Sequence, residues 1–130
     1  MDAGARAVAA ARGVIGVRFR LHGRDPAHGL DCVGVAAVAL RAAGYAGTMP
    51  CGYALRRGEW ARLADTLTGL RRVDDAAAGD VLLCRVGPGQ VHLIVSTGMG
   101  FVHADAALRR VVERPGAAPW PVLAGWRVEE

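Results

Sequence analysis

The stretch from Val35 to Ala43 reads V-A-A-V-A-L-R-A-A and is apolar on every helical face except at Arg41. A helix that is apolar all round is a buried helix. Asp31 is a favoured N-cap residue, and Gly44 suits the left-handed conformation that ends many helices. The sequence therefore predicts a central helix that begins just after Asp31, ends at Gly44 and is covered by the rest of the chain.

Cys32 falls in the first turn of this predicted helix. Free backbone N–H groups and the positive end of the helix dipole favour a thiolate there, and the thiolate is the reactive form of cysteine. A nucleophilic cysteine is one interpretation. The other is a small buried apolar side chain, which is the common fate of a free cysteine. The segment 29–34 by itself leaves both interpretations open.

A chain of 130 residues predicts a single domain over residues 1–130, and a hydrophobic content of 52% with 22% charged residues excludes a disordered chain. The 16 basic residues are all arginines, and they are scattered along the sequence. We therefore expect no nucleic-acid partner, because such proteins gather their basic residues on one face. A net charge of +4 still favours approach to an anionic polymer.

The first residues of the chain lack the strongly apolar core of a signal peptide, and no run approaches the roughly 18 apolar residues of a membrane span. We therefore expect synthesis in the cytoplasm, without a signal peptide or a membrane span. Cysteines at 32, 51 and 84 are odd in number and widely spaced, which argues against a disulfide framework.

The order of predicted elements indicates an α+β fold, because helices come first and an antiparallel meander follows. Helices are expected at 2–12, at the central segment and, on the surface, at 59–68. A short extended segment at 17–21 and a loop at 22–30 lead to Cys32. Strands are expected at 81–86, 90–96, 101–104, 109–114 and 122–128.

The tight turn at 97–100 predicts how two strand histidines are placed. If Ser96 pairs with Phe101, then Ile94 faces His103, and alternation puts His92 on the same face. His92 and His103 then lie diagonally across the hairpin, within reach of a ring-to-ring contact. Slippage of the pairing by one residue would separate them. Two adjacent histidines suit a base and the group that orients it.

Less specific interpretations of these residues also exist. A single strand histidine is often a satisfied core or rim residue. Cys32, Cys84, His92 and His103 could together bind zinc, but they lack the close C-x₂₋₄-C or H-x₃₋₅-H spacing of structural zinc sites. We therefore predict no metal, and we expect Cys84 and Cys51 to be passive.

Four short motifs occur in an order that matches a known family. Segment 29–34, G-L-D-C-V-G, resembles the motif F-D-C-S-G, and segment 79–83, G-D-V-L-L, resembles G-D-L-V-F-F. Segment 92–95, H-L-I-V, resembles H-V-G-I, and segment 100–104, G-F-V-H-A, resembles G-x-F-I-H-A. The sequence thus resembles the NlpC-type cysteine peptidases of the NlpC/p-sixty superfamily, which cleave peptide bonds in bacterial cell-wall peptidoglycan.

The resemblance implies a papain-like α+β fold, in which a central helix bearing Cys32 packs on an antiparallel sheet bearing His92 and His103. It implies a thiol endopeptidase acting on peptidoglycan stem peptides, such as the D-Glu–diaminopimelate bond that the family favours. Cys32 would be the nucleophile, His92 the base and His103 its orienting partner. Asp31 and Phe19 would be the substrate-binding positions, and no metal or cofactor is implied.

Two departures from the family pattern carry further expectations. Val33 replaces the usual serine after the cysteine, which resembles variants from phage and gene-transfer-agent tail gene clusters. We therefore expect incorporation into a phage-tail-like particle, with tail or baseplate proteins as partners. Phe19 stands where the family has a tyrosine, so this chain lacks the hydroxyl that would make one hydrogen bond to substrate or oxyanion. Segment 50–53 also lacks the family's usual R-T-S element.

Two other classes of function stay open. A structural or assembly protein of a tail tip would keep the fold without hydrolysis, and Phe19 would then reflect lost activity. The intact set of Cys32, His92 and His103 argues against that class. A thiol acyltransferase acting on lipids would be expected to carry a membrane-anchoring stretch, which the sequence lacks.

Overall fold

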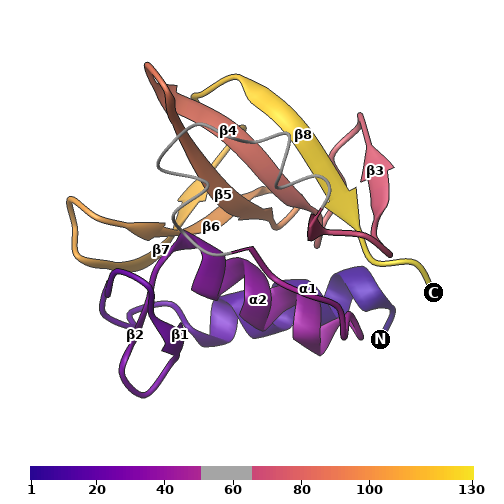
Figure 1. Ribbon diagram of the computed structural model, residues 1–130, viewed down its shortest axis with the longest axis horizontal. Coiled ribbons are helices and arrows are strands. Elements are labelled where there is room, and N and C mark those ends of the chain that lie inside the picture. Colours follow the sequence, from indigo (N-terminus) through magenta and orange to yellow (C-terminus); the bar gives the residue numbers. More distant parts are fainter. Residues whose placement is uncertain (51–65) are drawn as a thin grey trace.

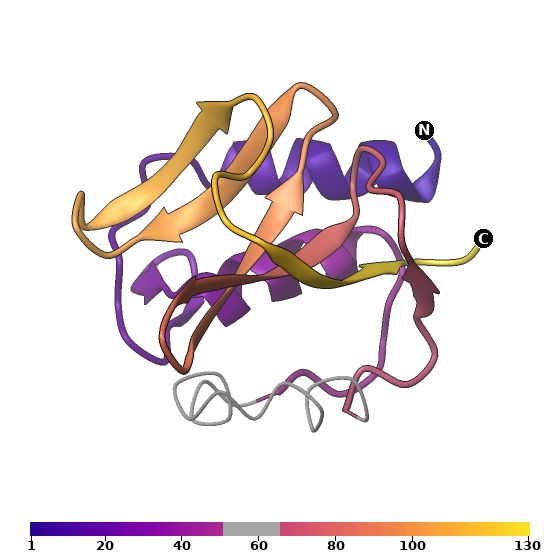
Figure 2. The same cartoon turned by 90° about the horizontal axis from the view of Figure 1, so that it is seen from above.

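Two helices lie side by side beneath a six-stranded antiparallel sheet in the computed structural model, which describes residues 1–50 and 66–130 (Figures 1 and 2). Helix α1 spans Ala3–Gly13 and helix α2 spans Cys32–Ala42. The predicted α+β architecture, with N-terminal helices packed on an antiparallel sheet, is confirmed. No helix in the described part of the chain is long and apolar enough to cross a membrane.

Helix α2 forms where the sequence predicts a buried helix. Asp31 is its N-cap, and its side chain accepts a hydrogen bond from the Gly34 backbone N–H. The helix ends just before Gly44, which has a φ of 104° and so takes up the left-handed conformation. On its buried side α2 packs against α1, whose contact face carries the small residue alanine, and against β5 and β6. Small side chains allow the two helix axes to approach closely.

The strands of the main sheet run in the order β3-β8-β4-β5-β6-β7. Strands β4 to β7 form a meander of hairpins, and β8 then returns to pair between β3 and β4. The bounds are Arg71–Val73 for β3, Val81–Gly87 for β4, Gln90–Ser96 for β5, Gly100–Asp105 for β6, Arg110–Pro115 for β7 and Val122–Arg127 for β8.

The two faces of the sheet have separate apolar clusters, as strand alternation requires. The inner face packs on the helices and includes Val81, Leu83, Leu93, Val95 and Val102. The outer face carries a smaller cluster of Leu82, Cys84, Ile94 and Phe101, which the partly buried side chains of Ala118 and Trp120 cover. Trp120 lies in the segment between β7 and β8, and its side chain covers the outer side of the β5–β6 hairpin.

The structure differs from the sequence-based expectation in its shortest elements. Strand β3 was not expected, since two of its three residues are exposed arginines; pairing with β8 is what makes it a strand. The expected loop 22–30 contains two two-residue strands, β1 (Arg24–Asp25) and β2 (Gly29–Leu30), which pair with each other. The expected surface helix 59–68 lies largely outside the described residues.

The expected extended segment 17–21 connects this loop to the main sheet. Single β-bridges join Arg18 to Arg110 of β7 and Phe19 to Leu30 of β2. The backbone N–H of Phe19 donates to the carbonyl of Arg109, 2.9 Å away. The segment therefore places the loop that precedes Cys32 against one edge of the sheet.

Glycines allow this loop to lie directly against the first turn of α2. A Cβ built on Gly34 would come closer than 3.0 Å to the carbonyl oxygen of Gly23, which is backbone and cannot move aside cheaply. Gly23 is packed in the same way against the carbonyl of Gly29. The close approach holds the start of α2, and with it Cys32, at a fixed position relative to the loop.

Gly34→Ala should therefore destabilise the fold by about 1–3 kcal/mol, the usual cost of overpacking a tight site. Gly13→Ala is the matched control, because a Cβ at Gly13 meets no atom within 4 Å. That change should leave stability unchanged or raise it by up to about 1 kcal/mol, since alanine favours helices. Urea unfolding of both variants measures the difference, and equal unfolding free energies would contradict the close packing.

Candidate active site

The buried carboxylate of Asp31 organises the entrance to the site. One oxygen accepts hydrogen bonds from the Gly34 N–H at 2.9 Å and from Arg24 Nη1 at 2.6 Å, and the other accepts from the His22 N–H at 2.9 Å. Asp31 is only 4% exposed. Its oxygens are thus already engaged in holding the loop on the helix, and its predicted contact with a substrate stays a prediction.

Cys32 begins α2 and is half-buried. Burial raises the pKa of its thiol to about 11, and the nearby charge of Asp31 also raises it. Hydrogen bonds from the backbones of Leu93 and Val33, together with the charge of Arg24, lower the thiol pKa by less. Loss of solvent thus outweighs the helix N-terminus, which by itself favours the thiolate, and the pKa of the Cys32 thiol lies above its ordinary value.

The histidine pair has the predicted register and contact. Ser96 pairs with Phe101 and Val95 with Val102 in the β5–β6 hairpin. Nε2 of His92 lies 2.9 Å from Nδ1 of His103, and the two rings meet edge to face with centroids 5.1 Å apart. Because Nε2 of His92 is engaged with His103, its Nδ1 is the nitrogen left to exchange a proton with another group.

Both imidazoles are neutral at physiological pH. Burial, reinforced by the charge that His103 can carry, lowers the pKa of His92 to about 4 against a partial rise caused by Asp105. Burial also lowers the pKa of His103, with Asp105 raising it and Arg114 lowering it further. A neutral imidazole has a lone pair ready to accept a proton, so His92 meets the first requirement of a general base.

Cys32, His92 and His103 all line one cavity of about 360 Å³. Phe19, a predicted substrate-binding residue, lines the same cavity, and so does Asp31. Both groups line the cavity, and among the described residues no hydrogen bond joins the Cys32 thiol to His92. Catalytic hydrogen bonds are often long or poorly aligned in empty sites and tighten when substrate binds.

Aromatic side chains pack around the histidine pair. The Trp120 ring lies edge-on to His92 at 5.9 Å and to His103 at 5.8 Å between centroids. Phe101 contacts both His103 and Trp120. The guanidinium of Arg114 lies 5.6 Å from the Trp120 ring centroid and 5.5 Å from that of Phe101. These contacts exclude water from the imidazoles, which explains their lowered pKa values.

Sequence reasoning missed Asp105, Arg114 and Trp120. A signal for Asp105 was available, since it follows His103 by two residues on one strand and so shares its face. Arg114 could have been found only from the β6–β7 register, which pairs it with Phe101. Trp120 lies in an irregular segment, and no pattern indicates that it folds over the hairpin.

The remaining cysteines and the larger cavity lie apart from this arrangement. Cys84 is fully buried in the outer apolar cluster, and Cys51 is outside the described residues. A cavity of about 550 Å³ at the other end of the protein is lined by residues such as Asp2, Asp80 and Arg127, and by no thiol or imidazole of the described chain. No group of three or more metal-ligating side chains occurs among the residues described.

No protein-family model and no curated protein matches the chain. Solved structures do match. The NlpC2 structure from Trichomonas vaginalis is 21% identical, with a TM-score of 0.71 over 97% of this chain. The chain spans about half of that protein, 48% of its length. The peptidoglycan hydrolase RipB from Mycobacterium tuberculosis is 22% identical, with a TM-score of 0.66 over 98% of this chain and 65% of its own.

A third structure corresponds to the chain along most of both lengths. It is the NlpC/p60 domain of the peptidoglycan hydrolase SagA, at 25% identity and a TM-score of 0.60, over 86% of this chain and 88% of the domain. All three are NlpC or peptidoglycan-hydrolase structures. The likeness shows that the chain has the papain-like α+β fold of NlpC/P60 domains, as the sequence predicts.

The neutral His92 gives a testable titration. By NMR, its imidazole should protonate with a midpoint near pH 4 in the folded protein, against about 6.5 for an unperturbed histidine. Because the unfolded chain takes up this proton first, the stability that neutral His92 contributes is complete above pH 6.5 and is lost as pH falls through 4. His92→Gln assigns the resonance and should reduce this acid destabilisation. A midpoint at or above 6.5 would contradict a buried, neutral base.

Proposed function

We propose that this protein is a cysteine endopeptidase that hydrolyses peptide bonds in the stem peptides of bacterial peptidoglycan. The observation that carries the proposal is the convergence of Cys32, His92 and His103 on one cavity. Support for the substrate class comes from the fold, which the chain shares with the NlpC/p60 domain of a peptidoglycan hydrolase. The net charge of +4 favours approach to an anionic wall polymer.

In the first half of the reaction, the thiol of Cys32 attacks the scissile carbonyl carbon while Nδ1 of His92 takes the thiol proton. Since the thiol and the imidazole are both neutral at rest, proton transfer accompanies attack, and no preformed ion pair is needed. The backbone N–H of Cys32, at the start of α2, would stabilise the oxyanion. Collapse of the tetrahedral intermediate releases the amine, which takes the proton from His92, and leaves a thioester.

In the second half, water replaces the amine. Nδ1 of His92 accepts a proton from the water as its oxygen attacks the thioester carbonyl. When the carbon–sulfur bond breaks, the proton passes to the Cys32 sulfur, so the acid product leaves and the neutral site is restored. His103 holds the ring of His92 through the 2.9 Å contact and spreads the positive charge that forms on it.

A different candidate is a structural or assembly protein of a phage-like tail tip that does not hydrolyse peptides. The observation in its favour is Phe19, which lines the cavity without the hydroxyl of the family's tyrosine. We favour the enzyme and propose that a phage-tail-like particle delivers it, on the strength of the Val33 variant of the cysteine motif. Tail or baseplate proteins would then be its partners.

Incubation of purified peptidoglycan with the protein, followed by mass spectrometry of the released fragments, tests the function. The parent should release stem-peptide fragments. Cys32→Ala should release none while unfolding as the parent does. Cys84→Ala is the matched control, since its thiol lies outside the cavity. Fragment release at the parental rate by Cys32→Ala would remove Cys32 as the nucleophile.

The two histidines should contribute unequally to the rate. His92→Gln should cost roughly 10²–10⁴-fold, the usual contribution of a general base. His103→Asn should keep measurable activity, because another polar group can still hold the His92 ring. The rates of fragment release from a soluble stem peptide measure both. If His103→Asn is as inactive as His92→Gln, the assignment of base and orienting partner does not hold.

Phe19→Tyr tests whether the enzyme lacks an oxyanion donor. A single donor of this kind is worth about 3 kcal/mol, roughly a hundredfold in rate. We expect faster hydrolysis with little change in stability, because only a hydroxyl is added to a half-buried ring. No gain would indicate that another side chain, such as His22 or Tyr53, already supplies the donor; Tyr53 lies outside the described residues. If neither the parent nor Phe19→Tyr hydrolyses peptidoglycan, the result favours the structural protein.

A further inference from the structure

The second ring nitrogen of His103 faces a carboxylate. Nε2 of His103 is buried and has no hydrogen-bond partner among the residues that the structure describes. Oδ2 of Asp105 lies 3.8 Å from it, and the His103 side chain is 4% exposed. This distance exceeds that of a hydrogen bond, so the interaction is electrostatic. Because His103 is buried, the charge of Asp105 is less screened than in water and favours a proton on the ring nitrogen that faces it.

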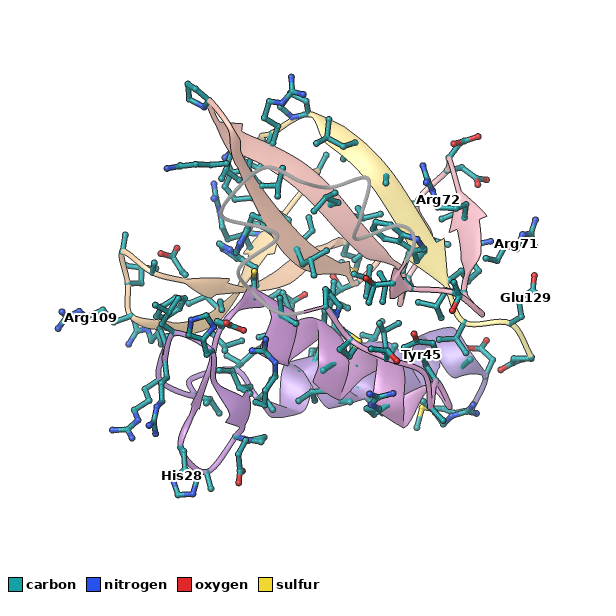
Figure 3. All side chains as sticks on the ribbon, in the orientation of Figure 1. His28, Tyr45, Arg71, Arg72, Arg109 and Glu129 are labelled. Carbon is teal, nitrogen blue, oxygen red and sulfur yellow. The ribbon has the colours of Figure 1, made fainter. Side chains whose placement is uncertain are left out.

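Asp105 is held in place by the turn that follows it. Its Oδ1 accepts hydrogen bonds from the backbone N–H groups of Ala107 and Leu108, each at 2.9 Å. These bonds fix the side chain at the start of the β6–β7 turn, whose tip carries Arg109 at the far end of the hairpin (Figure 3). The turn thus uses one oxygen of Asp105 and leaves the other to face His103.

The histidine pair can place its shared proton in two ways. In the first, Nε2 of His92 carries the proton and donates to Nδ1 of His103. His103 then carries its own proton on Nε2, facing the carboxylate, and Nδ1 of His92 has a free lone pair. In the second, Nδ1 of His103 donates to Nε2 of His92. His92 then carries a proton on Nδ1, and the bare Nε2 of His103 faces the negative charge.

Only the first arrangement lets His92 act as a base toward the cavity, and only that one places a proton between His103 and Asp105. We propose that Asp105 is a positioning residue that selects the tautomer of His103, and through it the proton-accepting tautomer of His92. The proposal extends the function proposed above, since the selected tautomer is the one in which Nδ1 of His92 can take the thiol proton.

The charges around His103 are consistent with this role. His92 contacts it from β5, and Arg114, which lies near it from β7, disfavours a positive charge on its ring. Asp105 is the acid among the groups that act on the pKa of His103, and its own pKa is lowered, so it is ionised at neutral pH. The negative charge therefore acts on a neutral ring, where it controls the position of one proton without adding another.

The test compares ring-nitrogen NMR spectra of ¹⁵N-histidine-labelled parent protein and Asp105→Asn at neutral pH. Protonated and unprotonated ring nitrogens give well-separated signals. The parent should show Nδ1 of His92 unprotonated and Nε2 of His103 protonated. Asp105→Asn keeps a side-chain oxygen for the turn and removes the charge, so both tautomers should be populated. A proton on Nδ1 of His92 in the parent, or a pattern unchanged by the substitution, would overturn the proposal.

Asp25→Asn is the matched control. Oδ2 of Asp25 lies 3.9 Å from Nε2 of His28, and its Oδ1 accepts from the Ala27 N–H, so it repeats the local geometry on an exposed loop. His28 lies at the tip of that loop, far from the sheet (Figure 3). This variant should leave the signals of His92 and His103 unchanged. A change as large as that in Asp105→Asn would overturn the proposal.

Hydrolysis of a stem peptide gives the second measurement. Asp105→Asn should lower kcat about tenfold with little change in KM, a part of the 10²–10⁴-fold that a general base contributes. An unchanged kcat would mean that Asp105 serves only the turn and would overturn its positioning role. If the parent does not hydrolyse peptidoglycan at all, the proposed function fails, while the NMR comparison still decides whether Asp105 selects the tautomer.

Discussion

The carboxylate of Asp31 determines where the central helix begins and how the preceding loop meets it. It bonds Gly34 in the first turn, and from the loop it bonds Arg24 and the backbone of His22. An N-cap alone contributes about 1 kcal/mol to the stability of the fold. If the buried carboxylate lost these hydrogen-bond donors, the loss of stability would be larger, because a buried charge would be left unsatisfied. Since Cys32 is the first residue of the helix, the position of its sulfur depends on this one group.

Burial has a second effect, which is chemical. The same packing that positions Cys32 and His92 removes water from both, so the thiol pKa rises to about 11 and that of the imidazole falls to about 4. Each shift favours the neutral form. These shifts favour a neutral thiol and a neutral imidazole in the empty site, so charge develops on both groups when a substrate reacts.

Much of the fold could be predicted because its signals are local. The all-round apolar segment predicted helix α2, and its two caps predicted its ends. The short turn after Ser96 predicted the contact of His92 with His103, since alternation along two strands follows from the register. Strand β3 could not be predicted, because a three-residue edge strand with two arginines has no local preference and exists only through its pairing with β8. The thiol pKa also could not be predicted, since the helix dipole can be inferred from position but desolvation cannot.

The sequence by itself determined the two helices, strands β4 to β8, their order and the pairing that brings two imidazoles together, because each depends on residues close along the chain. Tertiary structure decided the chemical state of the site. Trp120 covers the histidine pair from a segment far along the chain, and Asp105 faces it only because a turn orients one of its oxygens. Proton positions and pKa values depend on the distance to charge and to water, and those distances exist only once the chain has folded.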